Sequence, residues 1–281
     1  MRKRSRIAFT KLEALGNDFV LVDSRTTSFS PAREDIVALA DRHRGIGFDQ
    51  LLILRSPRET EALCRIDIFN SDGSRAEQCG NGMRAIALWL HRSGEFDRTA
   101  IVETLAGRID LTWHDHDQIT ATLPPPGFRP ADCGLSGHDR FPLELTAGGH
   151  QFSVLGAALG NPHLIVVLDQ APTAEQVLEI GSLLSRHEQL ADGANIGLAH
   201  LESDHRINLR VFERGSGPTL ACGSGACAAA TALIHANRAR NPVDVVQPGG
   251  KLVIDWQSEG EPVAMTGPAK VVFEGVIPWA T

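Results

Sequence analysis

Apolar positions in the first half of the chain fall into short runs separated by polar turn signals, among them residues 16–18 and 70–74. Short runs rich in valine, isoleucine and leucine are typical of strands. Strands are predicted around Phe9 and over residues 19–22, 51–54, 63–69, 108–113 and 118–123. A helix is predicted over residues 31–44, because Ser30 suits its N-cap and Gly45 its end. A second helix is predicted over residues 83–92.

The second half repeats this order of elements. Strands are predicted over residues 152–159, 195–201 and 207–212. One helix is predicted over residues 173–187, and another from just after Cys222 to about residue 238. Turns are predicted at 160–163 and 213–217, and the proline-rich residues 124–127 are typical of a linker.

Polar residues of the two halves recur at a nearly constant offset. The pairs separated by 143 to 145 residues are Asn17 with Asn161, Gln50 with Asn195, and Cys79 with Cys222. Asn70 and Glu213 each lie nine residues before the cysteine of their half. The alternative is coincidence among short glycine-containing strings. A domain-sized period favours a duplicated domain, with halves at 1–123 and 124–268 and with 269–281 as a candidate to return to the first half.

The two helices that follow the paired cysteines are apolar nearly all round, over residues 83–90 and 226–234. A helix without a polar face is buried. Strands outnumber helices in each half. The predicted fold class is therefore mixed α/β, with two pseudo-symmetric domains that each wrap a curved mixed sheet or barrel around one central buried helix.

Composition and charge narrow the class of protein. The chain has 281 residues, of which 42% are hydrophobic and 22% charged, so it is too apolar for a disordered protein. Its net charge of −7 argues against nucleic-acid and anionic-membrane partners. Five cysteines are few and odd in number, which favours a reducing compartment. The apolar residues 7–9 are too few for a signal peptide, and a cytoplasmic protein is expected.

Each paired cysteine stands just before a helix whose first turn contains glycines. The first N–H groups of a helix lack internal partners and carry the positive end of the dipole, so they stabilise a thiolate at this position. The N–H groups of residues 80–81 and 223–224 can also bind a carboxylate, because glycine lets the backbone approach closely.

Two similar halves that face each other would bring both cysteines to one cleft. One thiolate would then remove a proton from one face of a carbon while the other thiol donates a proton to the opposite face, which inverts a stereocentre. The helix N–H groups would stabilise the charge that develops on the substrate carboxylate. This arrangement requires no pyridoxal cofactor, and no metal site is expected. Residues 114–117 (HDHD) do not match zinc spacings and are interpreted as a solvated turn.

The chain resembles the diaminopimelate epimerase family over nearly its whole length after residue 7. The strings that carry the resemblance are 16–19 (GNDF), 70–74 (NSDGS), 79–84 (CGNGMR), 160–163 (GNPH), 194–197 (ANIG), 213–215 (ERG), 221–226 (ACGSGA) and 265–269 (MTGPA). The two cysteine strings alone would indicate only a wider superfamily. The resemblance implies the family's fold, cofactor-independent interconversion of LL- and meso-2,6-diaminopimelate in lysine and peptidoglycan precursor biosynthesis, and a homodimer.

The resemblance also implies roles for individual residues. Cys79 and Cys222 match the acid/base pair, and His163 and Glu213 match positions linked to catalysis. The positions that match substrate-binding residues are Asn17, Gln50, Asn70, Gly80, Asn81, Asn161, Asn195, Glu213, Arg214, Gly223 and Ser224. A substrate with a charged group at each end needs donors for its carboxylates and acceptors for its ammonium groups, and this set contains both.

The sequence departs from the usual residues of this family at two positions. Gln78 and Phe273 stand where related chains often carry methionine and tyrosine, and the second change removes a hydroxyl from the expected dimer contact.

Other interpretations of the sequence stay open. The protein could be a proline or hydroxyproline racemase of similar fold, a thiol redox protein or a non-catalytic amino-acid-binding protein, and the two paired cysteines could be purely structural. The asparagines and Arg214 favour a substrate with a second charged head group, which proline lacks.

Overall fold

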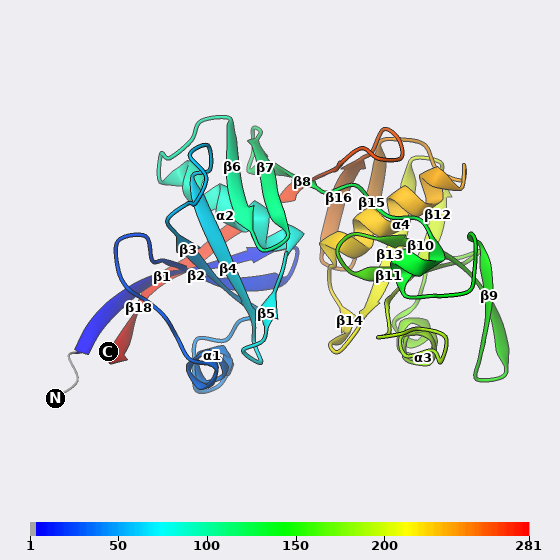
Figure 1. Ribbon diagram of the computed structural model, residues 1–281, viewed down its shortest axis with the longest axis horizontal. Helices are drawn as coiled ribbons and strands as arrows, with labels where there is room; N and C mark the ends of the chain where they lie inside the picture. Colours follow the sequence, from blue (N-terminus) through cyan, green and yellow to red (C-terminus); the bar gives the residue numbers. More distant parts are fainter. Residues whose placement is uncertain (1–3, 281) are drawn as a thin grey trace. The chain divides into compact units, whose positions relative to one another are not determined.

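The computed structural model describes residues 4–280, and the chain divides into two compact units. Unit 1 contains residues 1–121 and 268–281, and unit 2 contains residues 122–267. Figure 1 shows the elements of both units in sequence colours. Among the residues described, no helix is both long and apolar enough to cross a membrane.

Unit 1 contains a mixed sheet and two helices. Its helices are α1 (Arg33–Ala40) and α2 (Gly80–Arg92). Its strands are β1 (Arg4–Ala14), β2 (Asn17–Asp23), β3 (Gln50–Arg55), β4 (Cys64–Asn70), β5 (Arg75–Ala76), β6 (Thr99–Thr104), β7 (Gly107–Trp113) and β18 (Lys270–Ala280). β2 pairs parallel with β3, and β4 pairs parallel with β6, whereas β1 pairs antiparallel with β2 and β18. Strand β8 (Gln118–Leu123) spans the end of the unit.

Unit 2 has the same plan. Its helices are the short 3-10 helix η1 (Pro130–Cys133), α3 (Ala174–Leu184) and α4 (Gly223–His235). Its strands are β9 (Leu143–Ala147), β10 (His150–Ala158), β11 (Pro162–Val167), β12 (Asn195–Ser203), β13 (Arg206–Glu213), β14 (Gly217–Thr219), β15 (Val243–Gln247), β16 (Gly250–Asp255) and β17 (Val263–Pro268). β11 pairs parallel with β12, and β13 pairs parallel with β15.

The strand registers of unit 2 repeat those of unit 1. The partners Phe19 and Gln50 of β2 and β3 correspond to His163 and Asn195 of β11 and β12. At an offset of 143, the pair Cys64–Val102 of β4 and β6 corresponds to Ile207–Val245 of β13 and β15. Helices α2 and α4 are separated by the same offset and contain 13 residues each. The recurrence in sequence is therefore a recurrence of backbone topology.

Each long central helix is buried, as its all-round apolar sequence predicts. Of the 13 residues of α4, ten are buried, five of them alanine, and the helix contacts strands β10, β11, β12, β13, β15 and β16 of its own unit. Ten residues of α2 are buried as well, including the charged Arg84, and α2 contacts β1, β2, β7 and β18. Small residues let the surrounding strands approach α4 closely, and each helix holds its cysteine end in a fixed place.

The first predicted helix is wrong at both ends, because α1 covers only residues 33–40. Ala32, not Ser30, is its N-cap residue, and the backbone N–H of Ala32 donates to the Asp35 carboxylate (2.9 Å). The helix ends at Asp41, whose carboxylate accepts hydrogen bonds from the backbone N–H groups of His43 and Arg44. This local turn competes with continued helix.

Other boundaries also differ from the predictions. α2 begins at Gly80, three residues earlier than predicted, while α3 and α4 end at Leu184 and His235, each three residues earlier. The predicted turn at 160–163 is shorter, because β11 already begins at Pro162. Pattern reasoning gave no strand for β5, β6, β9, β11, β14, β17 or β18. The predicted linker is part of unit 2, where Gly127 exchanges two backbone hydrogen bonds with Ala158 (2.9 and 2.8 Å).

Candidate active site

Cys79 is the N-cap residue of α2 in unit 1. Its backbone is extended (φ −148°, ψ 105°), and its Sγ accepts a hydrogen bond from the backbone N–H of Gly82 (3.3 Å). This places the sulfur at the positive end of the helix dipole, where an N–H donor favours the thiolate. The local fold at Cys79 thus agrees with the chemistry inferred from the sequence.

Two asparagines surround Cys79. Asn17 begins β2 just after Gly16, whose φ of 87° lets the chain turn tightly from β1. The Oδ1 atom of Asn17 lies 3.9 Å from Cys79 Sγ, and Asn81 donates to the same oxygen through Nδ2 (3.4 Å). Asn81 is buried and stands in the first turn of α2. The structure therefore brings Asn17, Cys79 and Asn81 together.

Gln50 and Asn70 form a second polar pair of unit 1, on the adjacent strands β3 and β4. They are register partners, and Gln50 Nε2 donates to Asn70 Oδ1 (2.9 Å). Asn70 Nδ2 donates to Ser74 Oγ (3.0 Å), which closes the turn at 70–74. The Oε1 atom of Gln50 is buried and accepts no hydrogen bond from the residues that the structure describes. A buried carbonyl oxygen in this state is suited to accept from a substrate ammonium group.

Cys222 occupies the equivalent N-cap position of α4 in unit 2. Its backbone is extended (φ −121°, ψ 110°), and its Sγ accepts from the backbone N–H of Gly225 (3.4 Å). Ser224 Oγ lies 3.6 Å from the sulfur. The backbone N–H of Cys222 donates to Gln247 Oε1 (2.9 Å), so the end of β15 also holds this residue.

His163 lies next to this cysteine, in strand β11. Its Nε2 is 3.1 Å from Asn161 Oδ1 and 3.2 Å from Ser224 Oγ, whereas its buried Nδ1 makes no hydrogen bond within residues 4–280. An unpaired buried N–H costs more than an unpaired lone pair, so the proton belongs on Nε2. Complete burial lowers the pKa of His163 to about 3 and keeps the ring neutral.

The neutral ring of His163 connects to Cys222 through Ser224. The Nε2–H group is shared between Asn161 Oδ1 and Ser224 Oγ, and the hydroxyl that accepts from it can turn its own proton toward Cys222 Sγ. Ser224 therefore links His163 to the thiol of Cys222.

The remaining predicted residues of unit 2 lie at the ends of strands. Asn195 Oδ1 accepts from the backbone N–H of Arg214 (2.8 Å), and Asn195 Nδ2 lies 3.4 Å from His163 Nε2. Arg214 donates to the backbone carbonyl of Asp192 (2.8 Å). Glu213 Oε1 accepts from Thr219 Oγ1 (2.7 Å). Asn161, His163, Ser224 and Cys222 are thus one connected cluster with Asn195 beside it, while the side chains of Glu213 and Arg214 have these other partners.

Sequence reasoning missed three residues of these clusters. Asp49 accepts from Asn17, Arg84 donates to Asn81, and Gln247 holds the Cys222 backbone. Arg84 carried a detectable signal, because it is a charge inside an otherwise apolar helix. No local pattern marks Asp49 or Gln247, which reach their partners across 32 and 25 residues of chain.

The other cysteines have a different environment. Cys64 lies in β4 and Cys133 in η1, and burial raises the pKa of each thiol to about 12. Cys227 is fully buried inside α4. Cys64 and Cys133 are free thiols. Within residues 4–280, no group of three or more histidine, cysteine or acidic side chains could hold a metal ion.

Solved structures with the same fold cover nearly the whole chain. A hydroxyproline epimerase from Agrobacterium vitis matches with a TM-score of 0.74 at 12% identity, covering 100% of this chain and 95% of that one. A PhzF-family protein from Bacillus anthracis matches with a TM-score of 0.69 at 16% identity, covering 98% and 100%. The predicted fold class is confirmed: the chain has the fold that PhzF-type proteins share with this class of amino-acid epimerases and racemases.

Sequence relatives narrow this class to one family. Diaminopimelate epimerase from Laribacter hongkongensis is 43% identical over 276 residues, which cover 97% of this chain and 99% of that protein. The enzyme of the same name from Aromatoleum aromaticum is 41% identical over 276 residues, covering 96% and 98%. The family model described as diaminopimelate epimerase matches residues 9–126 and 157–272. The chain belongs to the diaminopimelate epimerase family, and the resemblance seen in its motifs is confirmed.

Proposed function

We propose that this protein interconverts LL- and meso-2,6-diaminopimelate without a cofactor, in lysine and peptidoglycan precursor biosynthesis. The observation that carries the proposal is the pair Cys79 and Cys222, each the N-cap residue of the buried helix in its unit. Full-length relatives at 40 to 43% identity bear this enzyme's name.

The proposed reaction is an inversion by two bases. One thiolate removes the α-proton of the substrate and becomes a thiol, and the electron pair moves into the α-carboxylate as an enediolate. The other thiol then delivers its proton to the opposite face and becomes a thiolate. Both thiols must reach the same α-carbon. The carboxylate would bind to the N–H groups of Gly80, Asn81, Gly223 and Ser224, which stabilise the developing charge.

The remaining predicted residues suit the charged groups of the substrate. Arg214 and the amide nitrogens of Asn17, Asn161 and Asn195 are donors for carboxylates. Gln50, through its buried Oε1, and Asn70 and Glu213 supply acceptors for ammonium groups. His163 would tune Cys222 through Ser224.

Incubation with meso-2,6-diaminopimelate in D₂O, without added cofactor, tests this function. Deuterium is expected at the α-carbon together with formation of the LL isomer, because the donating thiol exchanges with solvent. Proline and hydroxyproline are the control substrates and should not exchange, since they lack the second charged end. Absence of deuterium in diaminopimelate would contradict the epimerase proposal, and turnover of proline instead would favour the racemase alternative.

We also propose a homodimer located in the cytoplasm. Strand β18 exposes apolar side chains, with Val272 at 53%, Phe273 at 47% and Val276 at 46% of their full accessibility. Large apolar side chains exposed on one strand favour a protein interface. Sedimentation velocity should show a dimer for the intact protein and a monomer for Phe273→Asp; a monomeric intact protein would contradict the dimer. The support for a reducing compartment is the small and odd number of cysteines in the chain.

A further inference from the structure

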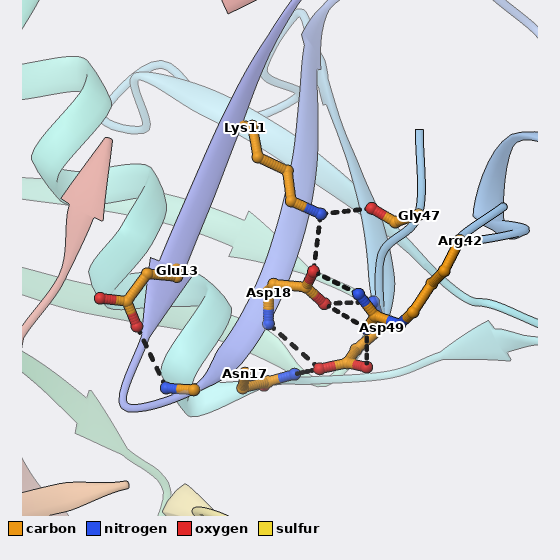
Figure 2. A network of polar contacts seen from close by, with 8 residues as sticks. Lys11, Glu13, Asn17, Asp18, Arg42, Gly47 and Asp49 are labelled. Carbon is orange, nitrogen blue, oxygen red and sulfur yellow. Dashed lines mark hydrogen bonds and ion pairs between the residues drawn. The ribbon is translucent and has the colours of Figure 1, made fainter. Parts of the chain in front are cut away.

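Asn17 belongs to a series of three hydrogen bonds in which each side chain donates to the next one. Arg84 Nη2 donates to Asn81 Oδ1 (2.9 Å), and Asn81 Nδ2 donates to Asn17 Oδ1 (3.4 Å). Asn17 Nδ2 in turn donates to Asp49 Oδ2 (2.8 Å). The last contact is drawn in Figure 2. Two side-chain amides therefore lie in series between a guanidinium and a carboxylate.

The two charged ends decide how the amides are oriented. A guanidinium can only donate and a carboxylate can only accept. Arg84, which is 0% exposed, therefore requires the oxygen of Asn81, and Asp49 requires the nitrogen of Asn17. The oxygen of Asn17 is then directed toward Asn81 and toward Cys79 Sγ, 3.9 Å away. With the opposite orientation of Asn17, two donors would face each other at Asn81 and two acceptors at Asp49.

Asp49 is itself held in place by a cluster of charges, which Figure 2 shows. Its carboxylate also accepts from the backbone N–H of Asp18 (3.1 Å) and from Arg42 Nη2 (2.8 Å). Arg42 makes two further bonds to the Asp18 carboxylate (2.8 Å each), and Lys11 Nζ donates to it as well (2.7 Å). These cations hold the pKa of Asp18 well below its usual range despite burial.

The turn that carries Asn17 is fixed on its other side. Glu13, at the end of β1, accepts from the backbone N–H of Gly16 (3.1 Å), and this contact is also visible in Figure 2. Five charged side chains form this cluster, namely Lys11, Glu13, Asp18, Arg42 and Asp49, and among the hydrogen bonds that these five make within residues 4–280 only that of Asp49 reaches the amide of Asn17.

We propose that Asp49 is a positioning residue, which holds the Asn17 carbonyl toward Cys79 and thereby partly offsets, in favour of the protonated thiol, the preference for the thiolate that the helix N-terminus creates. An acceptor oxygen can take a hydrogen bond from S–H but gives none to a thiolate. Cys222 differs, because its side-chain neighbour is the Ser224 hydroxyl, which can donate. The inference rests on the proposed function, in which Cys79 is an acid/base group.

Thiol titration tests this inference without any need for turnover. Iodoacetamide alkylation of Cys79 and Cys222 is followed from pH 6 to 10 by peptide mass spectrometry on the full-length protein. Asp49→Ala is expected to lower the pH midpoint of Cys79 by about one unit, a tenfold change in the thiolate ratio, and to leave Cys222 unchanged. It should also lower kcat more than it raises KM, because a misplaced amide acts on the reacting thiol.

Two matched variants separate positioning from charge. Asp49→Asn keeps an oxygen acceptor for Asn17 but removes the negative charge, so it should restore the wild-type midpoint. Asp18→Asn removes a neighbouring negative charge without touching the Asn17 amide, so it should lower stability and leave the Cys79 midpoint unchanged.

The inference is overturned if Asp49→Ala leaves the Cys79 midpoint unchanged, shifts both thiols equally, or behaves the same as Asp49→Asn. Failure of the proposed function would appear separately, as absent deuterium exchange in the wild-type protein. A shifted midpoint in an inactive protein would support the positioning role and contradict only the reaction.

Discussion

Cys222→Ser is expected to lose epimerisation by at least about 10³-fold while still exchanging the α-hydrogen of one isomer with solvent. The remaining thiol, Cys79, can remove a proton and return one to the same face, which exchanges deuterium without inversion. The isomer whose α-hydrogen points to the missing base should show no exchange. The measurement is mass spectrometry and chiral analysis of LL- and meso-diaminopimelate after incubation in D₂O.

Serine is chosen because both cysteines are N-cap residues. A serine hydroxyl keeps the acceptor for the N–H of Gly225 or Gly82, so the helix end should stay intact, but its much higher pKa makes it a poor base. Cys79→Ser should show the reciprocal pattern, in which only the other isomer exchanges its α-hydrogen with solvent. This reciprocity is specific to two bases on opposite faces.

Cys227→Ala is the matched control, because Cys227 lies on the same helix as the Cys222 N-cap and is fully buried. Its activity should remain close to that of the unsubstituted protein. If either serine variant still inverts the stereocentre at a wild-type rate, or if both variants exchange the same isomer, the two-base mechanism is wrong.

The stability of the protein is expected to fall steeply as the pH drops below about 6.5, and much of this loss should disappear in His163→Phe. Burial lowers the pKa of His163 from 6.5 to about 3, so the folded protein keeps the ring neutral while the unfolded chain takes up a proton. Protonation therefore favours the unfolded state throughout this pH window.

The size of the effect follows from the two pKa values. Between pH 7.5 and pH 5, proton uptake by this one residue in the unfolded chain lowers the free energy of unfolding by about 2 kcal/mol. Below pH 3 the loss stops growing, because the folded protein is then protonated as well. Urea unfolding of both proteins at the two pH values measures the difference.

Phenylalanine is the replacement that the fold itself suggests. Phe19 holds the equivalent register position in unit 1, where it is fully buried opposite Gln50 as His163 is opposite Asn195. The other histidines are common to both proteins, so their contribution cancels in the comparison. If the free energy of unfolding falls by the same amount between pH 7.5 and pH 5 in both proteins, His163 is not the buried neutral group described here.

The positions of the two cysteine-led helices could be predicted from sequence because the signals are local. An apolar pattern on every face indicates burial, and a cysteine followed by glycines indicates an N-cap. The end of α1 could not be predicted in the same way, since it depends on how the Asp41 carboxylate turns back to His43 and Arg44. Strands β6 and β11 were missed because each is defined by parallel pairing, with β4 and with β12 respectively.

The sequence alone determined the duplicated plan, the two thiols at helix starts and the family, because these are recorded in residue order and in a constant offset. Only the tertiary structure decided which groups lie beside each thiol. Asn17 and Asp49, Asn81 and Arg84, and Ser224 and His163 are joined by hydrogen bonds. Such bonds depend on atoms being about 3 Å apart and correctly directed. Parallel strand pairing and buried helices create that proximity between residues that the linear order keeps apart.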